Sequence, residues 1–246
     1  MTSKDGQKSP EYGYWASWRL LLALGIITVV LFALSYLIIY LLVGAVLALA
    51  EFAFIAYGRY QMSARGANIQ VKLWDTLIEH LDWDGKGRAV DVGCGSGAVA
   101  IRLAKKYPSA QVVGVDYWGS MWEYSQAQCE QNAIAEGVEN RVSFQKGDAA
   151  KLLFEDGFFD AAVSNDTFHN VRSAKDKREV LKEALRVVKK GGAFAFQDTF
   201  MMKRYYRSEP NDLLSTIRSW GIENVYMVKT MDSRLSIRAY LIWGTK

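Results

Sequence analysis

The chain has few of the residues that bind metals or form disulfides. Its 246 residues include only 2 cysteines and 2 histidines, and these lack the spacing of metal ligands, which argues against a zinc site. Cys94 and Cys129 lie far apart in the sequence, which is typical of a protein in a reducing compartment. We therefore expect neither a metal nor a disulfide framework.

The excess of charge of one sign is also small. The net charge is +4, and the basic residues are interleaved with acidic ones, as in Lys175–Glu179. This scatter does not make the basic patch that binds nucleic acid, so we expect no nucleic-acid partner. The chain lacks repeats and low-complexity runs, and 50% hydrophobic residues are enough for a full core.

No charged residue occurs between Leu20 and Ala50, a run of about 31 residues. An uncharged apolar run of about 18 residues is already long enough to suggest a membrane span. Aromatic residues before it resemble an interfacial belt. We expect residues 1–17 to form an N-terminal cytoplasmic or interfacial segment, 18–57 a transmembrane segment, 58–74 a juxtamembrane connector with a helix start, and 75–246 a globular domain.

A signal peptide, one long helix and a hairpin of two spanning helices compete for residues 18–57. The apolar part of a signal peptide has only about 7–15 residues. About 40 helical residues extend roughly 60 Å, enough for two crossings of a 30 Å hydrocarbon core. Basic residues flank both ends: Lys4, Lys8, Arg19, Arg59, Arg65 and Lys72. Both flanks satisfy the positive-inside rule only if both are cytoplasmic, which favours the hairpin, with the globular domain on the cytoplasmic side.

Strand and helix patterns alternate after residue 88, which predicts an α/β domain with a parallel, doubly wound sheet. We expect strands at Ala89–Val92, Gln111–Asp116, Arg141–Lys146, Phe159–Ser164 and Ala193–Gln197, and two more at Asn224–Lys229 and Ser236–Trp243. We expect helices at Gly97–Lys106, Ser120–Glu136, Ala174–Lys189 and Asp212–Trp220. The last two strands have no helix between them and predict a terminal hairpin.

A glycine-rich turn follows the first of these strands, in the sequence Val90-Asp91-Val92-Gly93-Cys94-Gly95-Ser96-Gly97. Glycines let the backbone turn sharply and let a ligand approach closely, and the helix start offers unpaired N–H groups. The turn therefore predicts a nucleotide-like ligand. It also satisfies the dinucleotide fingerprint, so it leaves a nicotinamide cofactor open.

Polar residues close each parallel strand, where open α/β sheets bind their ligands. In chain order they are Asp91, Asp116, Gly147-Asp148-Ala149, Asn165-Asp166-Thr167-Phe168-His169-Asn170 and Gln197-Asp198-Thr199.

These motifs, together with Gly114-Val115-Asp116 and Phe159–Ser164, resemble those of class I S-adenosylmethionine-dependent methyltransferases in their order and spacing. Residues 163–192 are similar to the small-molecule branch that includes quinone and sterol methyltransferases. The resemblance covers about residue 75 to the C-terminus and implies a Rossmann-like, seven-stranded sheet whose last strand is antiparallel. Where that branch often has a histidine pair, this chain has His169-Asn170.

The resemblance implies that S-adenosylmethionine is the cofactor and assigns residues to it. Asp91 would order the glycine turn or the methionine amino group, Asp116 would accept from the ribose hydroxyls, and Asp148 would accept from the adenine amine. Tyr117 and Met121 would pack on the adenine or ribose. The remaining expected cofactor contacts are Gly93, Cys94, Gly95, Gly97, Gly147, Ala149 and Asn165.

His169 is the expected base if the methyl acceptor must lose a proton, with Asp166 and Asp198 behind it; a lid role for His169 stays open. Because the domain would lie next to the bilayer, we expect a small lipophilic acceptor such as a quinone, phenol, thiol, isoprenoid or lipid headgroup. Two alternatives remain: a membrane-anchored methyltransferase of soluble molecules, and a tethered cofactor-binding module without catalysis.

Overall fold

The uncharged N-terminal run forms two helices, α1 (Trp18–Ser35) and α2 (Tyr40–Met62). The computed structural model describes residues 16–35, 38, 40–63, 65–119, 124–200, 202–206, 210–232 and 238–246. Most of the expected segment 1–17 and the cofactor candidate Met121 lie outside these residues. The chain divides into two compact units between Lys72 and Leu73, close to the expected boundary at residue 75.

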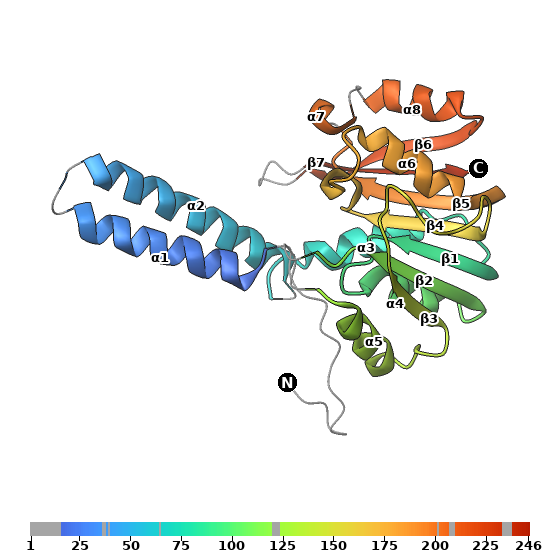
Figure 1. Ribbon diagram of the computed structural model, residues 1–246, viewed down its shortest axis with the longest axis horizontal. Helices are drawn as coiled ribbons and strands as arrows, with labels where there is room; N and C mark the ends of the chain where they lie inside the picture. The colour runs from blue at the N-terminus through green and yellow to red at the C-terminus, as the bar shows by residue number, and fades with distance from the viewer. Residues whose placement is uncertain are drawn as a thin grey trace. The chain divides into compact units, whose positions relative to one another are not determined.

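The two helices of the first unit lie side by side as an antiparallel hairpin (Figure 1). Gly25 faces the ring of Phe52, where an added Cβ would meet a ring carbon at 3.5 Å. Arg59, near the end of α2, donates to the carbonyl oxygen of Ala16 and lies 5.8 Å from the centroid of the Trp18 ring. The helices are thus joined by small-residue packing and by one cationic side chain.

The second helix continues past the expected boundary at Tyr57. Residues 58–62, which the sequence analysis assigned to a polar connector, are the last turn of α2. The side chain of Gln61 donates to the Tyr57 hydroxyl one turn earlier, at 2.5 Å. Polar residues on a helix can remain helical when they pair at this spacing, and the sequence pattern did not reveal that pairing.

A seven-stranded sheet forms the centre of the second unit (Figure 1). Its strands are β1 (Gly87–Val92), β2 (Ala110–Asp116), β3 (Val142–Lys146), β4 (Phe159–Asn165), β5 (Val188–Asp198), β6 (Asn224–Asp232) and β7 (Arg238–Thr245). The order is β3-β2-β1-β4-β5-β7-β6, with β7 antiparallel to both neighbours. This confirms the expected doubly wound sheet and its terminal hairpin. The carboxyl ends of β1, β2, β4 and β5 share one edge.

Helices cover both faces of this sheet. They are α3 (Ile69–Glu79), α4 (Ala98–Lys106), α5 (Gln126–Ala135), α6 (Lys177–Arg186), α7 (Lys203–Tyr206) and α8 (Pro210–Ser219), with a 3₁₀ turn η1 (Phe168–Asn170) after β4. Neighbouring residues of a strand point to opposite faces. Val90 and Val92 of β1 join the core beside α6, whereas Asp91 bonds to α4, so these two helices lie on opposite faces.

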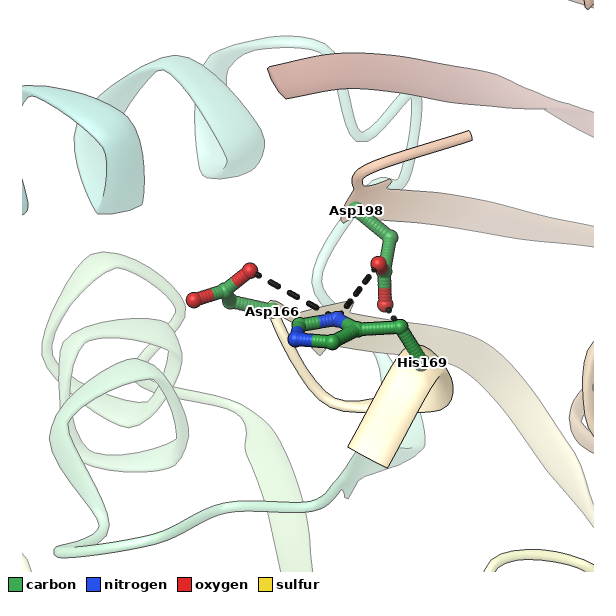
Figure 2. Close-up of side chains that lie close together, drawn as sticks. All are labelled: Asp166, His169 and Asp198. Carbon is green, nitrogen blue, oxygen red and sulfur yellow. Dashed lines mark hydrogen bonds and ion pairs between the residues drawn. The ribbon is translucent and has the colours of Figure 1, made fainter. Parts of the chain in front are cut away.

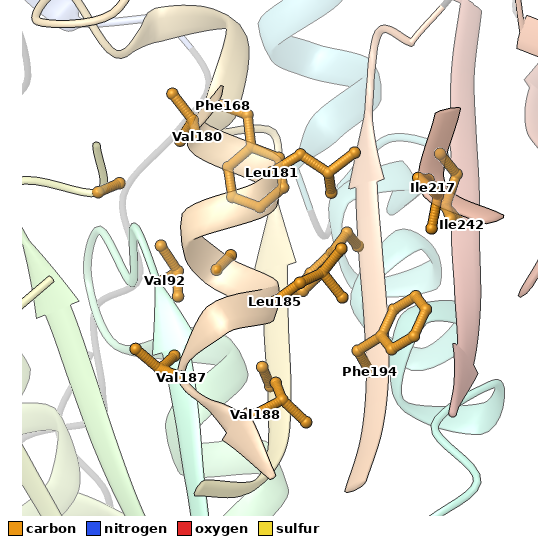
Figure 3. Close-up of a cluster of buried hydrophobic side chains, with 14 of the residues drawn as sticks. Val92, Phe168, Val180, Leu181, Leu185, Val187, Val188, Phe194, Ile217 and Ile242 are labelled. Atoms are coloured by element: carbon orange, nitrogen blue, oxygen red, sulfur yellow. The ribbon is translucent and has the colours of Figure 1, made fainter. Parts of the chain in front are cut away.

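The main hydrophobic core lies between the sheet and helices α6 and α8 (Figure 3). Leu181 and Leu185 of α6 and Ile217 of α8 pack there against Phe194 of β5 and Ile242 of β7. All five are at most 2% exposed. Burying such side chains contributes about 1.5–3 kcal/mol each, which fixes the strands whose ends carry the polar residues.

Two helices and one strand differ from their expected bounds. The helix expected over Ala174–Lys189 spans only Lys177–Arg186, and β5 begins at Val188 instead of Ala193. The N–H of Gly191 donates to the Lys246 carbonyl and the N–H of Lys246 donates to the Gly192 carbonyl, so this polar, glycine-containing stretch is held by pairing with the end of the chain. The helix expected from Ser120 begins at Gln126, capped by the Ser125 side chain.

Gly97 carries a steric constraint that a matched glycine lacks. Both Gly97 and Gly137 have a positive φ, of 82° and 68°. An added Cβ at Gly97 would lie 2.9 Å from the Phe144 ring, whereas at Gly137 no described atom lies within 4 Å. We expect Gly137→Ala to destabilise the protein by about 1 kcal/mol through backbone strain, and Gly97→Ala by about 1–3 kcal/mol more. The free energy of unfolding of the full-length protein measures the effect of each substitution. Equal losses of stability in the two variants would contradict the packing argument.

Candidate functional site

The turn between β1 and α4, which we call the glycine loop (residues 93–97), is fixed by hydrogen bonds to β2 and to a side chain that follows β4. The N–H groups of Gly93 and Cys94 donate to the carbonyl oxygen of Val115 in β2, at 2.7 and 3.1 Å. The hydroxyl of Thr167, just after β4, donates to the Gly93 carbonyl at 3.1 Å. An added Cβ at Gly93 would lie 2.0 Å from the Thr167 side chain, so only glycine fits there.

Asp91 holds the start of α4. Gly97, the residue before the helix, has no side chain with which to cap it, and the buried carboxylate of Asp91 accepts from the Ala100 N–H at 3.0 Å instead. Burial, with a smaller contribution from the charge of Asp116, outweighs this bond and raises the pKa of Asp91 to about 7. The side chain expected to order the glycine loop or the cofactor therefore bonds to the helix that follows that loop.

Asp116, at the end of β2, lies directly beside the glycine loop. Its Oδ2 accepts from the Gly95 N–H at 2.9 Å, and its Oδ1 accepts from the Trp118 N–H at 2.8 Å. The indole N–H of Trp118 donates to the Gly95 carbonyl at 2.9 Å, and Trp118 has a positive φ of 44°. Trp118 thus lies against the loop in a strained conformation, a role that the adjacent Tyr117, 64% exposed, does not share.

The other expected cofactor residues differ in their placement. Asp148 Oδ1 accepts from the Ala150 N–H at 2.9 Å and the Ser173 hydroxyl at 2.8 Å, and Asn165 Oδ1 accepts from Gln197 at 2.7 Å. Gly147 follows β3 and bonds to the Asp116 carbonyl at 2.9 Å. The side chains of Cys94 and Ala149 are buried and face the core, so they can line a ligand site only through their backbone.

Asp166, His169 and Asp198, the three expected catalytic residues, lie together and form what we call the acid–base cluster (Figure 2). His169 Nδ1 lies 2.7 Å from Asp198 Oδ1 and 3.8 Å from Asp166 Oδ1. The Asp198 side chain is 0% exposed, His169 18% and Asp166 48%. Their polar atoms lie within 4.8 Å of one another, but the closest contact is a hydrogen bond to a buried carboxylate, the geometry of an acid–base pair.

The electrostatics of the cluster favour a charged imidazole. Burial alone would lower the pKa of His169, but the hydrogen bond and charge of Asp198, with the charge of Asp166, outweigh it and raise the pKa to about 9. At neutral pH His169 is therefore a cation, and a proton already occupies the position that a general base must have free.

Sequence reasoning missed three residues that support the cluster. Lys177 is buried, and its ammonium donates to the Val171 and Ala174 carbonyls; burial lowers its pKa. Tyr206 of α7 is buried beside Asp198, and burial followed by that carboxylate's charge raises the pKa of its hydroxyl. Thr167 joins the cluster's loop to the glycine loop. The sequence analysis named Thr167 among the strand-end residues but gave it no role, whereas no sequence signal marks Lys177 or Tyr206.

The His169–Asp198 pair makes stability depend on pH. The pKa of His169 is about 9 in the folded chain and 6.5 in the unfolded chain. The pair therefore stabilises the fold fully below about pH 6.5, and this stabilisation is lost as the pH rises through 9. We expect His169→Gln to cost up to about 3 kcal/mol near pH 6.5 and little near pH 9.5. Unfolding midpoints against pH measure this, with His80→Gln as the control; a pH-independent loss would contradict it.

Comparisons with known proteins identify a methyltransferase domain in this chain. Residues 90–196 match the family described as "Methyltransferase domain". The chain is 34% identical over 124 residues to the sterol 24-C-methyltransferase erg6 of Aspergillus fumigatus (50% of this chain, 30% of that protein). It is 27% identical over 173 residues to the 2-phytyl-1,4-naphtoquinone methyltransferase of Trichormus variabilis (69% and 68%).

The fold also matches solved structures. Geranyl diphosphate C-methyltransferase from Streptomyces coelicolor superposes with a TM-score of 0.58 at 14% identity, covering 74% of this chain and 81% of that one. The chain spans about a third of the length of the first curated relatives it matches. Residues 90–196 therefore form a methyltransferase domain, and the seven-stranded sheet that carries them has the fold of the class I S-adenosylmethionine-dependent methyltransferases.

Proposed function

We propose that this protein is an integral membrane enzyme that transfers the methyl group of S-adenosylmethionine to a small, lipophilic acceptor held in or at the bilayer. The observation that carries the proposal is the contact between Asp116 and the glycine loop, at the edge of a domain that follows two apolar helices. The relatives named for a sterol and for a phytyl naphthoquinone support an acceptor of this class.

The residues present fit the cofactor. The glycine loop puts backbone without Cβ atoms at the carboxyl end of β1, and Asp116 offers a carboxylate beside it to the ribose hydroxyls. Asp148 and Asn165, from the neighbouring strand ends, bring further polar groups to the same edge. When bound, S-adenosylmethionine supplies a methyl group on a sulfonium, so that the protein contributes mainly positioning and the exclusion of water.

The exposure of α1 and α2 supports insertion into a membrane. Both are long and apolar enough to cross a bilayer, and only 11% of each apolar window is buried. Val29 is 68% exposed and Val43 63%. A helix in the core of a soluble protein would bury such side chains, whereas lipid would cover them here.

A short connection favours an acceptor from the bilayer. Residues 63–68 alone join α2 to α3, at most about 20 Å of extended chain. Such a tether keeps the catalytic domain at the membrane surface, where lipophilic molecules are concentrated. With basic residues on both flanks of the hairpin, the proposed side is cytoplasmic.

Cofactor binding tests the first half of the proposal. We expect the detergent-purified protein to bind S-adenosylmethionine and S-adenosylhomocysteine in calorimetric titration, and not NAD. Asp116→Ala should abolish this binding because it removes the acceptor of the ribose hydroxyls and of the Gly95 N–H. Asp82→Ala, at an exposed aspartate, is the matched control. Binding of NAD alone would contradict the methyltransferase proposal and would favour a dehydrogenase, whose nicotinamide cofactor the glycine loop also fits.

Topology tests the second half. We expect single cysteines introduced by Ser3→Cys and Ser63→Cys to react with a membrane-impermeant maleimide from the same side, and Ser35→Cys to react from the opposite side. The two native cysteines are buried and give the background. If Ser35→Cys reacts from the same side as the other two, the hairpin does not cross the bilayer.

A further inference from the structure

We propose that Asp166, and not His169, takes the proton of the methyl acceptor, and that the methylated atom is a hydroxyl oxygen. This inference rests on the proposed transferase function and deepens it by naming the base and the acceptor group. It reverses the roles that the sequence suggested, in which His169 was the base and Asp166 lay behind it.

Accessibility separates the three members of the acid–base cluster. Asp198 is enclosed: its Oδ1 accepts from His169 Nδ1 at 2.7 Å and the Thr199 N–H at 2.6 Å, and its Oδ2 accepts from the His169 N–H at 3.3 Å. Asp166 has a side chain that is 48% exposed and, among the described residues, meets only the imidazole, at 3.8 Å. Asp166 is therefore the carboxylate that an acceptor molecule can reach.

The charge on His169 removes it as a base. The groups that face it are Asp198 from β5, Asp166 after β4, Lys177 from α6 and Tyr205 from α7. Its ring lies 5.8 Å from that of Tyr205. The two carboxylates keep the imidazole protonated over the whole neutral range, since its pKa is about 9. We assign His169 the role of a positioning residue whose cation holds Asp166.

Asp166 is prepared for proton transfer by its backbone and its surroundings. Its φ of 55° is rare for a residue other than glycine, and its N–H donates to the Gln197 carbonyl at 2.8 Å, which keeps the carboxylate at the strand end. The surrounding protein excludes water from part of the group and raises its pKa toward 6, against the opposing His169 cation. Water reaches the exposed half of the carboxylate and limits this rise in its pKa. The rise still makes Asp166 a stronger base than an ordinary aspartate.

The exposed carboxylate of Asp166 favours a hydroxyl as the acceptor group. An O–H can donate to Asp166 before the transfer, whereas a C–H cannot. An amine would bind there as its cation, which has no lone pair to attack. In the step, the acceptor O–H bond breaks and its proton moves to Asp166. The oxygen electron pair forms the O–CH₃ bond, and the S–CH₃ bond breaks with its electron pair remaining on sulfur, so a neutral ether and a protonated carboxyl result.

Histidine NMR tests the charge assignment without any acceptor. The chain has only two histidines, so ¹³C labelling of the full-length protein in detergent gives two imidazole signals, and His80→Gln identifies His169. With S-adenosylhomocysteine bound, we expect His169 to titrate near pH 9 and to show a second inflection below pH 7 from Asp166. The second inflection should vanish in Asp166→Asn. Titration of His169 below pH 7, or an unchanged second inflection, would overturn the proposal.

Turnover of lipophilic phenols tests the base itself. We would use alkylphenols with three chain lengths and measure the methyl ether over pH 5–10. A base at Asp166 predicts a kcat/KM plateau between its pKa and about 9, whereas a base at His169 predicts a rate that rises up to about pH 9. Asp166→Asn should lower kcat/KM by roughly 10²–10⁴-fold. Asparagine tolerates positive φ, so this variant keeps the backbone. Asp212→Asn, at an exposed site on α8, is the control.

Two further results separate this inference from the proposed function. His169→Gln removes the cation that lowers the pKa of Asp166. In this variant the acidic limb of the kcat/KM profile should move to higher pH, and the limb near pH 9 should vanish. An unchanged profile would contradict the positioning role of His169. If the protein binds S-adenosylmethionine but methylates none of the phenols, the hydroxyl assignment is wrong, while the proposed transferase function is not contradicted. If it binds no S-adenosylmethionine, the proposed function itself fails.

Discussion

The bond from the buried Asp91 carboxylate to the Ala100 N–H is the contact on which the site depends. It closes the first turn of α4 where Gly97 cannot, and so lets the chain pass from β1 into the helix through five residues. That turn brings Gly95 to Asp116 and Gly93 to Thr167. Burial of the Asp91 carboxylate raises its pKa and lowers the stability of the fold. In return, its bond to Ala100 keeps the glycine loop ordered.

Much of the fold could be predicted because its signals are local. The apolar strands, the glycine turn and the caps placed six of the seven strands close to their observed ends, and the missing helix before the last strand indicated the hairpin. The start of β5 could not be predicted, because Gly191 and Gly192 are held by Lys246, which is distant in the sequence. The end of α2 was missed for a different reason: Gln61 bonds to Tyr57 one turn earlier, and the sequence analysis did not consider this local pair.

The proximity of three candidate site residues could be predicted from the sequence, but their burial and charge could not. Strand ends identified Asp166, His169 and Asp198, since parallel strands bring their carboxyl ends to one edge. Which carboxylate is buried, and whether the histidine is charged, depends on packing by α6 and α7, on Lys177 and on Tyr206. No spacing in the sequence encodes those contacts, so the order of roles within the cluster had to come from three-dimensional distances.

The contact between Thr167 and Gly93 links the two halves of the site through one hydroxyl and one carbonyl. This hydrogen bond is the contact through which a ligand on the glycine loop would act on the loop that carries the acid–base cluster. Linkage then makes the effect mutual: by whatever factor one bound molecule tightens the binding of the other, the second tightens the first equally. The Thr167 side chain leaves no space for even a methyl group at Gly93, so the two loops are held in close contact at this point.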